Sequence, residues 1–140
     1  MALPTTLHLH IASSDRSLVD ETVDEVQIPG VQGYFGVLPG HTPLLAQLSV
    51  GDLWYRQGSE THHLAMAYGF AEVQPDRVTI LAETAESADE IDEARAEAAK
   101  RRAEERLRIP NADIDIDRAS VALKKAIVRI QVSQRARAGV

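Results

Sequence analysis

The segment VTILAETAESADEIDEARAEAA, residues 78–99, contains the point at which the pattern of the chain changes. Up to about Ala82, apolar residues alternate with other residues at period two, which predicts half-buried β-strands. Residues 88–138 contain no glycine and one proline and are rich in Ala, Glu, Arg and Lys, a composition that favours helices. We therefore predict two units, one of strands over residues 1–87 and one of helices over residues 88–140.

The first unit has the pattern of an antiparallel β-sandwich. Turn-forming clusters recur at PGVQG, LPGHTP, SVGD, RQGSE and QPDR, at intervals typical of an antiparallel sandwich or barrel. We expect eight to ten strands, with Trp54, Tyr55 and Tyr68 in the core. The predicted fold class is thus mostly β with added α: an N-terminal antiparallel sandwich of about ten strands and a C-terminal antiparallel two-helix hairpin.

Pro110 is expected to divide the second unit into two helices. Ser87 or Asp89 is the predicted N-cap of the first helix, and Asp115 that of the second. The predicted apolar stripes are Ala96, Ala99, Ala103 and Leu107 on the first helix, and Ile116, Ala119, Leu123, Ala126 with Ile127, and Ile130 on the second. Because alanine buries little area, we expect a thin seam that separates at low cost.

Charge is distributed unevenly along the chain. Residues 1–87 have a net charge of −8, and residues 88–140 a net charge of +2. Acidic residues end at Asp117, and residues 118–140, here called the basic arm, contain six cations. They are Arg118, Lys124, Lys125, Arg129, Arg135 and Arg137.

Several functions are excluded by what the sequence lacks. It has no cysteine, no apolar run of the roughly 20 residues that cross a bilayer, and none of the common hydrolase or nucleotide-binding motifs, so we expect no enzyme and no nucleic-acid partner. His8 and His10 share one strand face, and a neighbouring strand could add His62 or His63. The sequence places no carboxylate beside them, so we expect no metal site.

The corner PGVQGYFGVLPGHTPLL, residues 29–45, contains four glycines and three prolines. Glycines allow close backbone approach, and prolines lower the entropy lost when a partner binds. Such a preorganised corner suits a protein interface, and within it His41 is expected to be a hydrogen-bonded turn residue.

Three segments together resemble one family, the epsilon subunit of bacterial and chloroplast F-type ATP synthase. They are GYFGVLPGHTPLLAQLSVGDL, AYGFAEVQPDRVTILAETAE and ADEIDEARAEAAKRRAEERL, which begin at residues 33, 67 and 88. The resemblance implies a ten-stranded sandwich, a helical hairpin and a non-catalytic rotor subunit of the proton-translocating complex. It also implies peripheral attachment, through that complex, to the cytoplasmic face of the bacterial plasma membrane.

The resemblance further implies partners for particular residues. Gln32, Gly33, Tyr34 and Phe35 would face the c-ring, and Ser13 and His41 the gamma subunit. The basic arm would extend to acidic segments of the alpha and beta catalytic subunits and block rotation in the hydrolysis direction.

ATP is the one ligand that the resemblance suggests, and no cofactor is required. Residues 91–96, IDEARA, are similar to a motif with which some members bind ATP in the folded hairpin. The implied set is Glu86, Asp92, Arg95, Ala96, Lys125 and Arg129. Because lysine replaces an arginine at position 125 and lacks its bidentate fork, we expect weak regulatory binding or none. In the simpler interpretation Asp92 and Arg95 form a surface pair.

Two other functions remain open on the residues alone. One is a free-standing sandwich that binds proteins and dimerises through its helical tail. The other is a small-molecule sensor.

Overall fold

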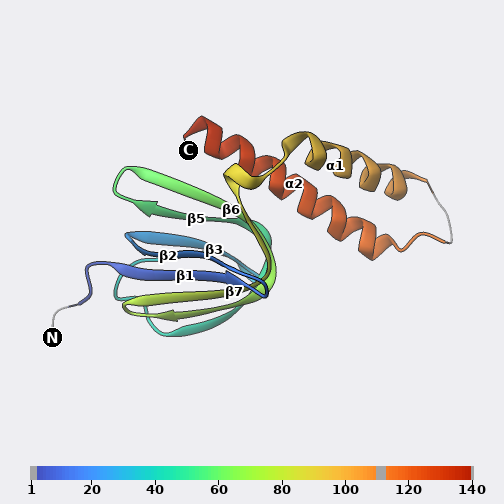
Figure 1. Ribbon diagram of the computed structural model, residues 1–140. Helices are drawn as coiled ribbons and strands as arrows, with labels where there is room; N and C mark the ends of the chain where they lie inside the picture. Colours follow the sequence, from blue (N-terminus) through green and yellow to red (C-terminus); the bar gives the residue numbers. More distant parts are fainter. Residues whose placement is uncertain (1–2, 110–112, 140) are drawn as a thin grey trace.

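The computed structural model describes residues 3–109 and 113–139, and within them seven strands precede three helical segments. The strands are β1 (Leu7–Ser13), β2 (Ser17–Val23), β3 (Glu25–Gly30), β4 (Gly33–Val37), β5 (Leu44–Gln57), β6 (Glu60–Gln74) and β7 (Arg77–Ser87). The helices are η1 (Ala88–Glu90), α1 (Glu93–Arg108) and α2 (Ile116–Ala138). Figure 1 shows a curved sandwich with the two long helices packed together beside it, which confirms the predicted fold class.

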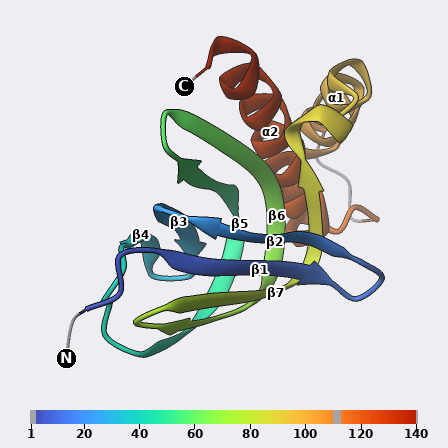
Figure 2. The ribbon, with the colours of Figure 1, turned by 60° about the vertical axis from the view of Figure 1, so that its left-hand side comes forward.

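The strands are hydrogen-bonded in the order β2-β1-β7-β6-β5-β3-β4, and each neighbouring pair is antiparallel except β1 and β7. Alternation decides which side chains enter the core: Leu7, Leu9 and Ile11 of β1 are fully buried. His8 and His10 point to the other face. Figure 2 shows β6 curving strongly along its length, so that one strand serves both layers of the sandwich.

The strand count is lower than the predicted ten because β5 and β6 are long and continuous. The turn predicted at SVGD is wrong, since Gly51 pairs with Met66 and the pairing continues to the end of β5. The chain bends there without ending a strand: Tyr68 and Gly69 of β6 have φ angles of 60° and 118°. The other four predicted turns are confirmed, at residues 31–32, 39–40, 58–59 and 75–76.

The first α-helix begins later than predicted. Ser87 caps only the short η1 turn, whose Glu90 carboxylate accepts a hydrogen bond from the Ser87 amide. Ile91 is extended and ends that turn, so α1 starts at Glu93 with Asp92 as its N-cap. The predicted cap of α2 is confirmed, because the Asp115 carboxylate accepts from the Arg118 amide at 3.0 Å. Pro110 lies outside the described residues.

Candidate functional site

Helix α2 packs on the outer face of strands β5 and β6. Val128 and Val132 of α2 are buried against Val50, Ala65 and Ala67, which form a second apolar cluster outside the sandwich core. Burying each valine stabilises the docked helix by roughly 1.5–3 kcal/mol. The sequence-based stripe omitted both valines, because they belong to a second face of the same helix.

The seam between the two helices is lined by alanine, as predicted. Ala96, Ala103, Ala119 and Ala126 are all buried. Ala99, Leu107, Leu123 and Ile127 are half-buried, Ile130 is buried, and Ile116 is 65% exposed, so the predicted stripe of α2 does not include its first residue. The sandwich also holds α2, so the seam is only part of the contact that α2 would have to break, and low-cost separation of the seam stays a prediction.

Three arginines of the basic arm form ion pairs inside the chain. Arg129 Nε lies 2.8 Å from Glu86 of β7, Arg135 Nη1 2.8 Å from Asp52 of β5, and Arg137 Nη1 2.7 Å from Glu93 of α1. Lys125 Nζ lies 5.6 Å from the centre of the Tyr68 ring, a cation–π contact. Arg118 and Lys124 are exposed. The described arm is therefore docked on the sandwich and α1.

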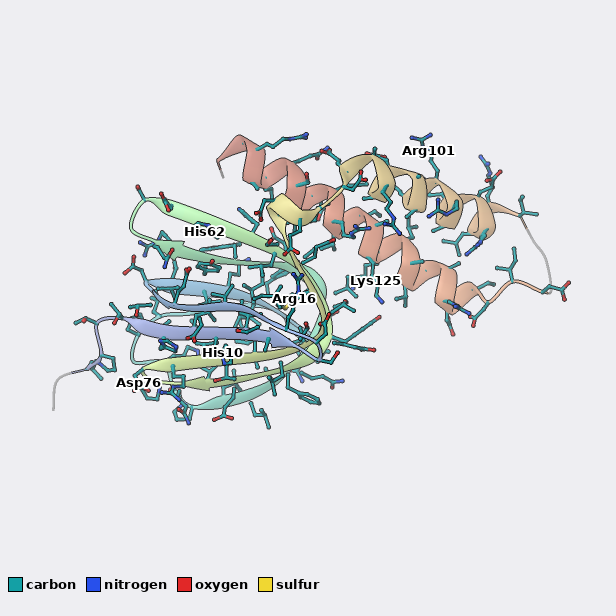
Figure 3. All side chains as sticks on the ribbon, viewed as in Figure 1. His10, Arg16, His62, Asp76, Arg101 and Lys125 are labelled. Atoms are coloured by element: carbon teal, nitrogen blue, oxygen red, sulfur yellow. The ribbon has the colours of Figure 1, made fainter. Side chains whose placement is uncertain are left out.

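Residues of the suggested nucleotide set fall in two places. Glu86, Lys125 and Arg129 line a cavity of about 280 Å³ between the sandwich and α2, together with Arg16. In Figure 3 Arg16 and Lys125 lie where α2 faces the sandwich, whereas Arg101 projects from the far side of α1.

The remaining residues of that set lie at the start of α1. Asp92 Oδ1 accepts from the Arg95 amide at 3.1 Å, and Ala96 is buried in the seam. Asp92 is thus a helix cap, and it contacts the main-chain amide of Arg95.

Arg16, which the sequence interpretation did not include, ties the β1–β2 turn to η1. Its guanidinium donates to both oxygens of Glu90, at 2.7 and 3.2 Å. The hydrogen bonds from Arg16 and Ser87 lower the pKa of Glu90 to about 2. The contact fixes the start of the helical unit to the sandwich.

Ser13 borders a large hollow on the sandwich surface. Its hydroxyl donates to Asp15 at 2.6 Å. The hollow, of about 640 Å³, is also lined by Phe70 and Leu81, which lie opposite each other on β6 and β7 and are 55% and 58% exposed. The sequence interpretation missed these two residues, although an apolar residue at an outward position of a strand is the signal that marks them.

His41 makes a local contact: its Nδ1 lies 2.7 Å from the Thr42 carbonyl oxygen. This agrees with the expected hydrogen-bonded turn residue. His41 does not line the hollow beside Ser13.

The β3–β4 turn presents most of the residues predicted to face the c-ring. Gln32, Gly33 and Tyr34 are exposed, while Phe35 is half-buried and packs against the core. The Tyr34 hydroxyl accepts a hydrogen bond of 3.1 Å from the Asp52 amide. The turn is therefore held on β5 by its own tyrosine.

The histidines are not gathered into one site. His8 contacts Asp20, His10 contacts Ser17, and His63 Nδ1 lies 3.0 Å from both carboxylate oxygens of Asp52. Strand β7 separates β1 from β6 in the sheet. Among the described residues no group of three or more His, Asp or Glu is placed to hold a metal ion.

None of the helices in residues 3–109 and 113–139 is long and apolar enough to cross a membrane.

Comparison with protein families and known proteins covers almost the whole chain. Residues 6–88 match the family described as ATP synthase, Delta/Epsilon chain, beta-sandwich domain, and residues 89–134 match its long alpha-helix domain. The chain is 50% identical over 130 residues to an ATP synthase epsilon chain 2 of Syntrophotalea carbinolica, covering 92% of this chain and 94% of that one. It is 46% identical to an epsilon chain of Nitratidesulfovibrio vulgaris, covering 91% and 95%.

A solved structure has the same fold. A chain in the Euglena gracilis mitochondrial ATP synthase superposes with a TM-score of 0.81 at 24% identity, covering 99% of this chain and 84% of that chain.

Proposed function

The chain belongs to the delta/epsilon chain family of ATP synthase, and on that premise we propose that its sandwich couples the gamma subunit to the c-ring while α2 inhibits ATP hydrolysis. It is an epsilon chain, a non-catalytic subunit of the central stalk. We propose that the two units divide between residues 87 and 88. The complex would attach the chain to the cytoplasmic face of the bacterial plasma membrane.

The observation that carries the coupling role is the hollow beside Ser13, which Phe70 and Leu81 line. These two residues and the exposed Leu45 are here called the apolar patch. Phe70 pairs with Leu81 of β7 on one side and with Gln47 of β5 on the other. Leu45 lies two residues before Gln47 and so on the same face of β5, which places the three apolar side chains on one outward face of β5, β6 and β7. Contiguous exposed apolar surface of this kind marks a protein interface. We assign it to the gamma subunit.

The c-ring contact is assigned to the β3–β4 turn. Gln32, Gly33 and Tyr34 are exposed, and the hydrogen bond from the Asp52 amide to the Tyr34 hydroxyl orients the turn in advance. A turn fixed in this way loses little conformational entropy when a partner binds.

The inhibitory role is assigned to the basic arm. Arg129, Arg135 and Arg137 already bind carboxylates of this chain, so their guanidinium groups suit acidic segments of the alpha and beta subunits equally well. Extension of the arm would exchange one set of carboxylates for another. The ion pairs between the arm and the catalytic subunits would orient the arm more than they would raise its affinity, and they would weaken as salt is added.

A weak ATP site is a second assignment, supported by the cavity that Glu86, Lys125 and Arg129 share. Two features limit its affinity. Arg129 already binds Glu86, and Lys125 lacks the planar fork that pairs with phosphate oxygens in two places.

The coupling role is tested by a charge placed in the apolar patch. Phe70→Glu in the full chain should abolish capture of the gamma subunit, because a carboxylate at a buried interface is left without a partner. Ile116→Glu is the matched control, since Ile116 is equally apolar and 65% exposed but lies on α2. Full capture by the Phe70→Glu chain would exclude this face as the gamma interface.

A further inference from the structure

Asp52 is a carboxylate buried on the face of the sandwich that α2 covers. It shares this outer face of β5 with Val50 and pairs with Ala65 of β6, both of which pack in the cluster with α2. Only 2% of its side chain is exposed. A carboxylate in such a place is unfavourable unless hydrogen bonds and an opposite charge replace the lost water.

Two side chains supply that replacement. His63 Nδ1, from the neighbouring strand, lies 3.0 Å from each carboxylate oxygen and is itself 4% exposed. Arg135 Nη1 lies 2.8 Å from Oδ2, and it comes from a helix 83 residues further along the chain. Figure 1 shows the C-terminal half of α2 lying beside β5 and β6, where this contact forms.

We propose that the Asp52–His63 pair is a docking site for the Arg135 guanidinium group, and that this contact determines how readily the C-terminal half of α2 leaves the sandwich. Arg135 remains about half exposed when docked, at 47%, so it loses little hydration. Asp52 is buried beneath the helix and would regain water only when the helix leaves. The stability of the docked state therefore depends strongly on Arg135, although the Arg135 side chain is itself about half exposed.

The other two ion pairs of the arm are more accessible to water. The side chains of Arg129 and Glu86 are 27% and 31% exposed, and that of Arg137 is 66% exposed. Exposed pairs contribute little and are screened by salt. Among the three, the Asp52 contact is the one in which loss of the cation leaves an almost fully buried carboxylate that has lost one of its two side-chain partners.

The proposal predicts an ordering of variants that a mere packing contact would not give. Arg135→Gln should release α2, because the docked state then buries Asp52 without its cation. Asp52→Asn should release it less, since the amide that remains is neutral. Adding Asp52→Asn to Arg135→Gln should restore docking relative to Arg135→Gln alone, because the buried charge has been removed.

The measurement is amide hydrogen exchange in residues 126–134 of the full chain in isolation. Arg135→Gln should speed exchange at least about 10-fold, and the double variant should bring the rate back toward that of the unmodified chain. Arg118→Gln is the matched control: it removes the same charge from an exposed residue in the first turn of α2 and should change the rate less than about twofold. Exchange in β1 and β6 reports whether the sandwich itself stays folded.

The proposal is overturned if Arg135→Gln leaves exchange in α2 unchanged, or if the double variant exchanges as fast as Arg135→Gln or faster. Should Arg135→Gln loosen the sandwich as well, Arg135→Lys gives an independent answer. It keeps a cation near Asp52 and should leave exchange in α2 within about threefold of the unmodified chain, whereas exchange as fast as that of Arg135→Gln overturns the proposal.

The link between this contact and hydrolysis rests on the proposed inhibitory role, but the contact does not. If the exchange order holds while the hydrolysis rate of the assembled enzyme is the same with Asp52→Asn, a change outside the basic arm, the docking site stands and the inhibitory role fails.

Discussion

Replacing Gly69 with alanine should unfold or severely destabilise the sandwich. Gly69 has a φ of 118°, which L side chains rarely adopt, and an added Cβ would overlap the Leu81 carbonyl oxygen. It would also lie 2.9 Å from Ala82 Cα. These are main-chain atoms of the paired strand β7, so they cannot move aside without breaking the sheet.

The magnitude follows from two costs. The strained backbone accounts for about 1–3 kcal/mol, and the overlap with fixed neighbours for about 1–3 kcal/mol more. We therefore expect the free energy of unfolding to fall by about 2–6 kcal/mol, a large part of the 5–15 kcal/mol of a typical domain.

The assay is urea unfolding followed by circular dichroism, with Gly36→Ala as the control. Gly36 has an ordinary φ and nothing within 4 Å of its added Cβ, so its substitution should change the free energy of unfolding by less than about 1 kcal/mol. A Gly69→Ala chain as stable as the Gly36→Ala chain would refute the account of the bend in β6.

Three other outcomes are expected. Because the pKa of Glu90 is lowered from 4.5 to about 2, its contribution to stability is complete above pH 4.5 and is lost as pH falls toward 2. The urea concentration at the midpoint of unfolding should therefore fall less steeply between pH 4.5 and 2 in Glu90→Gln than in the unmodified chain. Glu104→Gln, at an exposed position of α1, should leave that fall unchanged. Burial raises the pKa of Tyr55 to about 12, so its contribution to stability should be lost as pH rises from 10 to 12. Tyr55→Phe should remove the step near pH 12 from the ultraviolet titration of the tyrosines. Lys125→Arg should strengthen ATP binding several-fold in calorimetry, since a guanidinium pairs with phosphate in two places, and no heat from either chain at millimolar ATP would exclude the site.

Local patterns in the sequence predicted the elements well. Period-two alternation located strands such as β1, and the Asp115 cap located the start of α2, because each depends on residues a few positions apart. The turn predicted at SVGD was wrong for a long-range reason. Gly51 stays paired with Met66, and the chain bends instead at Tyr68 and Gly69 on the partner strand.

The docking surface could not be predicted in the same way. The basic arm was evident from charge alone, but its acceptors, Asp52, Glu86 and Glu93, come from three separate elements. Their selection depends on where α2 lies on the sheet. The second apolar face of α2, with Val128 and Val132, was hidden because the helix is buried on two sides at once.

The coupling and inhibitory roles make different predictions for a chain that lacks the basic arm. Deleting residues 118–140 removes α2 beyond Asp117 and leaves the strands and the β3–β4 turn in place. The truncated chain should still capture the gamma subunit, because the apolar patch lies on β5, β6 and β7.

The most direct test is the ATP hydrolysis rate of the assembled enzyme, in preparations shown to contain the truncated subunit, with proton pumping measured alongside. The account predicts a higher hydrolysis rate with pumping retained. An unchanged rate would contradict the inhibitory role of the arm, and loss of pumping would contradict the assignment of coupling to the sandwich alone.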